Sequence, residues 1–161
     1  MRITSTKSRF LALLSSAVLV ATVVIATPAQ AAAVGPICDG KVPVQTCQGM
    51  TSDGAPFVMM VPANFNGTVA LYSHGYRYNL DLPAGMLPTV PAGYKVTNTP
   101  EPVPGGNTAV ANYFLGNGMA IMGSGFARQG WNLDSAIATN VELVAAFKKQ
   151  FPTTDHVLAW G

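Results

Sequence analysis

Two short segments of this 161-residue sequence carry residue types suited to acyl-transfer chemistry, and each follows or contains a run of apolar residues. The first is segment 73–77, Ser-His-Gly-Tyr-Arg, directly after the run 68–72. Gly75 allows the backbone to turn sharply, so that successive N–H groups can point at an oxyanion. On its own, a His-Gly pair at a strand end is more often a structural turn than an oxyanion loop.

The second segment, residues 155–161, ends at Gly161. A polar start, an apolar strand and a glycine are typical of the run into a Gly-x-Ser-x-Gly nucleophile elbow. The serine and the second glycine of that motif would lie beyond Gly161. A strand that ends in glycine is a weak signal by itself, and it gains weight only together with the first segment.

The order of the segments between these two points suggests a family. A His-Gly segment is followed by a long loop, a helix, a strand ending in Gly-Ser-Gly-Phe, a second helix and the strand before Gly161. In this order the chain resembles the N-terminal part of exported bacterial α/β-hydrolases, which are serine hydrolases, over residues 54–161, truncated at the nucleophile elbow. The matching residues are His74, Gly75, Tyr76, segment 117–126, Gly130, Trp131 and segment 159–161.

The resemblance implies a role for each matching site residue. It makes the backbone N–H of Tyr76 the first candidate oxyanion donor and that of Arg77 the next, while His74 and Gly75 belong to the same loop. Gly161 would be the first glycine of the elbow. The family's nucleophile, triad acid and triad base would lie further along, so the chain is expected to be inactive as given. The full-length parent would hydrolyse a small-molecule ester or peptide through an acyl-enzyme, with no cofactor and no metal.

Other residues could be taken for catalytic groups, and their surroundings argue against each. His74 precedes the oxyanion donor and is expected to orient the loop, while His156 begins the last strand and is expected to be structural. Ser124 lies between two glycines, but no Gly-x-Ser-x-Gly frame fits it. The same glycines could begin a dinucleotide-binding loop, yet the third glycine of that motif would fall at Arg128.

Strands and helices are expected to alternate around these segments. Strands are predicted at 57–61, 68–73, 119–122 and 157–160, and helices at 108–115 and from 132 or 134 to 149. Strands that alternate with helices imply a mostly parallel sheet with crossover helices. The expected fold class is α/β: a partial α/β-hydrolase fold, incomplete at its C-terminus, formed by residues 32–161.

A long proline-rich segment, residues 80–106, separates the His-Gly segment from the first predicted helix. Its prolines forbid a regular helix or a central strand. Long connections without secondary structure are uncommon in compact domains unless they serve a function or are disordered. We therefore expect a lid or a binding loop.

The N-terminus has the pattern of a cleaved export signal. Three basic residues precede an uncharged run, 10–25, and an Ala-x-Ala site follows at 29–31. Cleavage after residue 31 would leave six basic side chains against the seven acidic ones. The sequence thus predicts a secreted, extracellular protein with no stable membrane anchor after cleavage and no nucleic-acid partner.

Cys38 and Cys47 are the two cysteines of the sequence, and both follow the predicted cleavage site. In an exported protein such a pair favours a disulfide. A metal-binding pair is the alternative, but other ligands are lacking nearby.

A second interpretation remains open. The chain could be a small, complete secreted binding or structural domain in which the His-Gly pair and the final glycine are coincidental. The two interpretations differ in whether the coding sequence continues past residue 161 with a serine.

Overall fold

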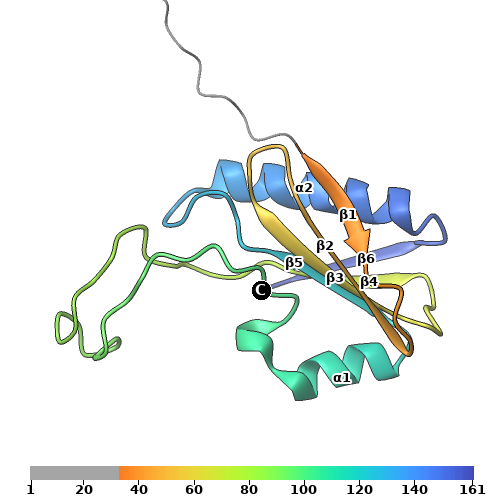
Figure 1. The fold of residues 1–161 in the computed structure, drawn as a ribbon, viewed down its shortest axis with the longest axis horizontal. Coiled ribbons are helices and arrows are strands. Elements are labelled where there is room, and N and C mark those ends of the chain that lie inside the picture. Colours follow the sequence, from red (N-terminus) through yellow and green to blue (C-terminus); the bar gives the residue numbers. More distant parts are fainter. Residues whose placement is uncertain (1–32) are drawn as a thin grey trace, which may run out of the picture.

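The computed structural model describes residues 33–161, so the predicted export signal lies outside the described residues. A six-stranded sheet forms the centre, with one α-helix on each side (Figure 1). The strands are β1 (Val34–Cys38), β2 (Val44–Met50), β3 (Pro56–Pro62), β4 (Thr68–Tyr72), β5 (Ala120–Ser124) and β6 (His156–Trp160). The helices are α1 (Thr108–Gly116) and α2 (Leu133–Gln150), with a short 3-10 turn, η1 (Pro104–Gly106), before α1.

The sheet is mixed, with the strand order β1-β2-β3-β5-β4-β6. The pairs β1–β2, β2–β3 and β3–β5 are antiparallel, whereas β4–β5 and β4–β6 are parallel. The prediction of a mostly parallel α/β-hydrolase sheet with crossover helices is therefore wrong. The physical reason is that β1, β2 and β3 are joined by the short connections 39–43 and 51–55, which permit only antiparallel neighbours.

The individual elements from residue 56 onward were predicted more accurately than their arrangement. β3, β4, β5 and β6 lie where strands were expected, and both helices lie within about two residues of their expected bounds. β1 and β2 were not predicted as strands. Residues 80–106 contain no α-helix, as expected. Their regular structure is the 3-10 turn η1 and an isolated β-bridge between Leu82 and Tyr94.

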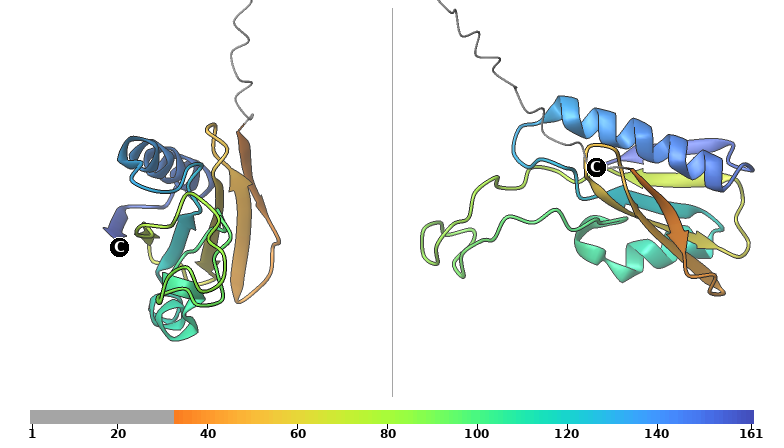
Figure 2. Two further views of the ribbon diagram at one scale, coloured as in Figure 1. Left: turned by 90° about the vertical axis from the view of Figure 1, so that its left-hand side faces the viewer. Right: turned by 45° about the horizontal axis from the view of Figure 1, so that its top comes forward.

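The two helices cover opposite faces of the sheet (Figure 2). Helix α2 buries Leu143 and Phe147 against the side chains of β3, β4 and β5 on one face. Helix α1 packs on the other face, where Leu115 meets Ala70 and Ile121. Side chains alternate between the two faces along each strand, and both faces are apolar, which explains why β5 is buried along its whole length.

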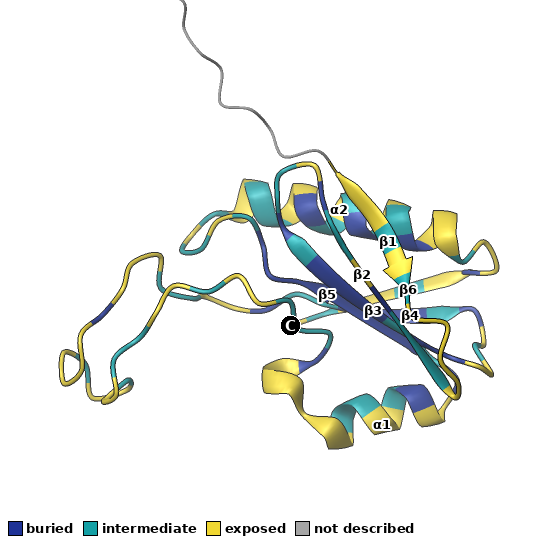
Figure 3. Cartoon of the chain, viewed as in Figure 1, coloured by how far each residue is buried: buried dark blue, intermediate teal, exposed yellow. Residues whose placement is uncertain are grey.

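The long loop, the outermost strands and the outer sides of both helices are exposed, whereas β3 and β5 are mostly buried (Figure 3). Strand β6 forms one edge of the sheet, and Leu158 near its centre is exposed. Within residues 33–161, no helix has both the length and the apolarity needed to cross a bilayer.

A disulfide joins the hairpin formed by β1 and β2. Cys38 and Cys47 are directly paired in the register of the two strands and are bonded, which confirms the predicted pairing. Cys47 is fully buried and belongs to the core under α2. A disulfide is compatible with an extracellular protein.

A second link ties the antiparallel half of the sheet to α2 through side-chain hydrogen bonds. The Asp53 carboxylate, in the turn between β2 and β3, accepts hydrogen bonds from Thr139 (2.7 Å) and Ser135 (3.3 Å) on α2. The hydroxyl of Thr51 also donates to Asp53. Burial raises the pKa of Asp53, but the hydrogen bonds from Thr51 and Thr139 outweigh it and leave that pKa below its usual value.

Reducing the disulfide should lower the free energy of unfolding by about 2–3 kcal/mol, the chain-entropy value for a loop this short. Urea unfolding of oxidised and reduced, alkylated protein measures the difference. Intact mass before and after reduction checks the bond itself, and free thiols in non-reduced exported protein would contradict it.

Asp53→Ala should lower the free energy of unfolding by about 1–3 kcal/mol, because the buried hydroxyl of Thr139 loses its acceptor. The pKa of Asp53 is lower in the folded state than in the unfolded state. The stabilisation by its hydrogen bonds is therefore present above the unfolded-state pKa and disappears as the pH falls through the folded-state pKa. The gap between wild type and variant should therefore be constant near neutral pH and shrink below about pH 4.

Asp134→Ala is the matched control, because it removes a carboxylate from the first turn of α2, the helix to which Asp53 is hydrogen-bonded. Its loss should be smaller, within the helix-dipole range of about 0.3–1 kcal/mol. Equal losses for both variants in urea unfolding would show that Asp53 acts through charge alone.

Candidate functional site

The candidate site lies where the carboxyl ends of β4, β5 and β6 come together. These three strands are parallel neighbours, so the segments that follow them leave the same edge of the sheet. The backbone N–H of Ser73, directly after β4, donates to the carbonyl of Trp160 at the end of β6 (2.8 Å). The structure thus brings together the two segments that the sequence singled out.

Gly161 lies directly against the segment that follows β4. A Cβ atom at residue 161 would clash with the carbonyl oxygen of Ser73, so this position requires glycine. Whatever follows Gly161 would start beside segment 73–77. The assignment of Gly161 as the first glycine of a nucleophile elbow stays a prediction.

Three successive backbone N–H groups in the segment have no acceptor. Within residues 33–161, the N–H groups of Gly75, Tyr76 and Arg77 donate no hydrogen bond. The same residues line a pocket of about 180 Å³. Successive unpaired backbone N–H groups can bind an oxyanion when they point into a concave surface.

His74 is buried beneath this segment. Its Nδ1 donates to the carbonyl of Gly75 (2.8 Å), which leaves Nε2 unprotonated in the neutral ring, and its ring lies 4.2 Å from that of Phe126 between centroids. Burial, together with the Arg77 cation, lowers the pKa of His74 below its usual value. These contacts hold the imidazole ring against Gly75 and Phe126, and its orienting role stays a prediction.

Phe126, which packs on His74, has a left-handed backbone conformation (φ 50°). Such a conformation costs a residue with a side chain roughly 1–3 kcal/mol and occurs disproportionately at functional sites. Two hydrogen bonds hold the preceding residue: the N–H of Gly125 donates to the carbonyl of Pro56 (2.8 Å), and the side-chain amide of Gln129 donates to the carbonyl of Gly125 (2.7 Å).

The end of the proline-rich loop packs directly on the end of β5, a contact that sequence reasoning missed. A Cβ atom at Gly123 or Gly125 would clash with the backbone of segment 98–101. Arg77 fixes this segment to the site, because its guanidinium donates to the carbonyl of Thr99 (3.0 Å) and pairs with Glu101 (2.8 Å). The two glycines that flank Ser124 are the sequence signal that could have indicated this close approach.

The other sequence candidates lie away from any catalytic arrangement. Ser124 is buried, and its Oγ has no hydrogen-bond partner among residues 33–161. His156 is exposed and pairs with Thr68 at the opposite end of β4, far along the sheet from His74. Among the same residues, no group of three or more His, Cys, Asp or Glu side chains could hold a metal ion.

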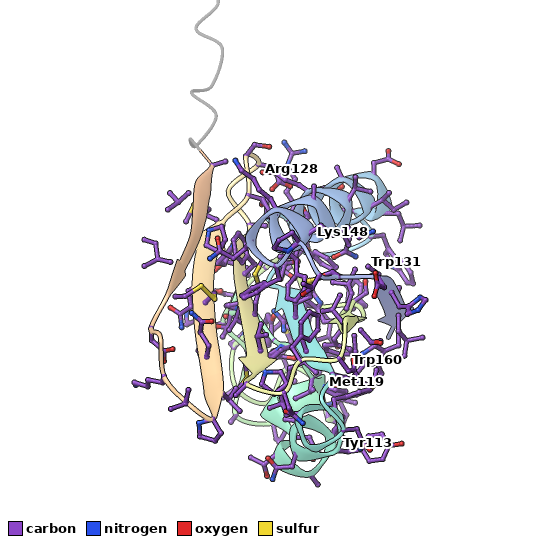
Figure 4. All side chains as sticks on the ribbon, turned by 90° about the vertical axis from the view of Figure 1, so that its right-hand side faces the viewer. Tyr113, Met119, Arg128, Trp131, Lys148 and Trp160 are labelled. Carbon is purple, nitrogen blue, oxygen red and sulfur yellow. A yellow bond between two sulfur atoms is a disulfide. The ribbon has the colours of Figure 1, made fainter. Side chains whose placement is uncertain are left out.

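Aromatic side chains surround the pocket, and sequence reasoning assigned them no role in binding. The rings of Tyr76 and Trp131 lie 5.5 Å apart between centroids. Trp131 is 85% exposed and Tyr76 51% exposed. The exposed indole of Trp131 is labelled in Figure 4, and this residue appeared in the sequence only as part of the family resemblance.

Comparisons of the sequence with protein-family models and curated proteins, and of the structure with solved structures, find no match. Similarity therefore assigns neither a fold family nor an activity to this chain. The functional argument rests on the geometry at the ends of β4, β5 and β6.

The lowered pKa of His74 predicts a pH-dependent stability. The folded state binds fewer protons than the unfolded state, so the free energy of unfolding should decrease as the pH falls from about 6.5 toward the folded-state pKa. His74→Gln should lack this decrease. Urea unfolding at several pH values compares the slopes, and an imidazole of His74 that titrates above the usual range in NMR would contradict the prediction.

Proposed function

We propose that this chain supplies the oxyanion-binding loop of an exported serine hydrolase that cleaves carboxylic esters or peptide bonds through an acyl-enzyme. The observation that supports the proposal most directly is that Gly75, Tyr76 and Arg77 have unpaired N–H groups and are residues that line a pocket. Donors held in place before the reaction stabilise the negative charge that develops on a carbonyl oxygen during acyl transfer.

The position of Gly161 supports a serine nucleophile next to this loop. Because Gly161 packs on the Ser73 carbonyl, a residue that follows it emerges beside the unpaired N–H groups. An elbow of this kind requires glycine where the backbone turns closely against its neighbour. In this proposal the chain is the N-terminal part of the enzyme, and the serine, the acid and the base belong to the part that follows.

In this proposal residues 33–161 offer binding and charge stabilisation, and no triad is assembled among them. His74 donates through Nδ1 to its neighbour's carbonyl, and His156 lies at the opposite end of the strands. Ser124 has no histidine as a hydrogen-bond partner among the described residues. An oxyanion site without nucleophile and base gives only a small part of the rate of a complete hydrolase.

A second candidate function is a secreted ligand-binding domain without catalysis. The exposed pair of Tyr76 and Trp131 beside the pocket favours it, since exposed aromatic side chains are typical of binding surfaces. The coding sequence past residue 161 separates the candidates. The hydrolase requires a serine within the next two residues followed by glycine and a second small residue, whereas the binding domain requires none.

The 161-residue chain should hydrolyse p-nitrophenyl esters no faster than a buffer control. Turnover that a serine-directed phosphonate abolishes would show that the nucleophile lies within this chain and would contradict the proposed arrangement. The protein expressed from the extended coding sequence should be active and should be labelled by the phosphonate.

In that active protein, Tyr76→Pro should reduce kcat by about 10²–10³, because proline removes the N–H that serves as an oxyanion donor. Tyr76→Ala is the matched control, since it keeps the N–H and removes only the ring, and its loss in kcat should be much smaller. Equal losses in kcat for the two variants would exclude the backbone donor.

A further inference from the structure

The pocket beside the proposed oxyanion loop has an aromatic wall that the hydrolytic chemistry does not require. Tyr76 and Trp131 both line it, and their rings are tilted by 38° relative to each other. Phe126, Leu133 and Ala136 supply further apolar lining. The wall thus joins the segment after β4 to the segment that leads into α2.

The position of Tyr76 is fixed by a series of aromatic contacts. Tyr78 packs edge-on against Tyr76 at 5.5 Å between ring centroids, and Tyr78 in turn packs against Tyr94 at the same separation. Because Tyr94 lies in the long loop, this loop supports the wall from behind. Aromatic rings in T-shaped contact hold one another in place.

The segment that carries Trp131 is also tied to the oxyanion segment. The N–H of Gly130 donates to the carbonyl of Arg77 (3.0 Å), and the N–H of Asn132 donates to Gly130. Gly130 has a positive φ of 87°, which a residue with a side chain rarely adopts. These bonds fix the backbone on both sides of Trp131, so that less of this segment has to be ordered when a ligand binds.

The volume of the pocket is close to that of a cavity that holds a single ring. An apolar protein cavity of about 150 Å³ binds benzene, and this pocket measures about 180 Å³. We propose that it binds one aromatic ring, carried by the acyl or the leaving group of the substrate, through stacking on Tyr76 and Trp131. This inference rests on the proposed hydrolase function and names the substrate class as aryl or benzyl esters and amides.

Aromatic and saturated rings of the same size distinguish stacking from simple burial. Aromatic pairs gain binding energy beyond that of buried area, equivalent to about a 2- to 12-fold change in affinity. The whole 161-residue chain should therefore bind benzyl alcohol more tightly than cyclohexylmethanol by roughly this factor. Ligand-observed NMR titration measures both affinities, and the indole N–H signal of Trp131 should shift with benzyl alcohol.

Three variants test the assignment to these side chains. Trp131→Ala and Tyr76→Ala should each weaken benzyl alcohol binding by up to about tenfold, and the high exposure of Trp131 means that its removal takes nothing from the core. Tyr113 is an exposed tyrosine on α1 outside the pocket, so Tyr113→Ala serves as the control and should leave the affinity for benzyl alcohol unchanged. Circular dichroism confirms folding of each variant.

Equal affinity for the two alcohols, or unchanged binding by Trp131→Ala, would overturn the aromatic site. Neither alcohol contains an acyl bond, so this result is independent of turnover. Loss of the ring site would leave the oxyanion proposal standing, and a failed hydrolysis test would leave the measured ring binding intact.

Discussion

The arrangement of the site depends on close contact between backbones at the carboxyl ends of β4, β5 and β6. Side chains are excluded there, because a Cβ atom at Gly123, Gly125 or Gly161 would overlap a neighbouring carbonyl group. The contact holds the returning loop segment 98–101 against β5 and the end of β6 against Ser73. Segment 73–77 begins at this contact, where the Ser73 N–H donates to Trp160, and the N–H groups of Gly75, Tyr76 and Arg77 have no partner among the described residues.

The two halves of the sheet contribute differently to this arrangement. The antiparallel half, β1 to β3, is held by the disulfide and by the hydrogen bonds between Asp53 and α2. The parallel half, β4 to β6, presents three successive strand ends at one edge. Phe57 and Met59 on β3 belong to the same buried cluster as Leu143 and Phe147, so the first half acts as a rigid support for α2 and for the site.

Local patterns in the sequence predicted much of the parallel half. Apolar runs such as 68–72 and the helical spacing in α2 depend on near neighbours, and these elements were predicted correctly. The hairpin of β1 and β2 was missed because its strands contain Gly, Pro, Gln and Thr, and because its stability comes from a disulfide and from cross-strand contacts. The relative direction of the strands was predicted incorrectly for the same reason, since the two unrecognised strands, β1 and β2, carry most of the antiparallel pairing.

The site itself was only partly predictable. Segment 73–77 and Gly161 were identified because a glycine after an apolar run is a local signal. The contact of Arg77 with Thr99 and Glu101, and the pairing of Tyr76 with Trp131, join residues far apart in the sequence. No spacing rule connects such residues, so only the folded chain shows that the long loop and the start of α2 belong to one site.

The same end of the sheet is also where the rules of a well-packed interior are least well satisfied. Among the described residues, the buried side-chain atoms without a hydrogen-bond partner belong to His74, Tyr94, Ser124, Gln129, Asn140 and Trp160. Each residue lies at a strand end of the site, lines the pocket, supports its aromatic wall or, like Asn140, contacts Ser73. The strained backbone of Phe126 lies among them. A left-handed backbone at a residue with a side chain occurs disproportionately at functional sites, so the conformation of Phe126 is consistent with the placement of the candidate site at this end of the sheet.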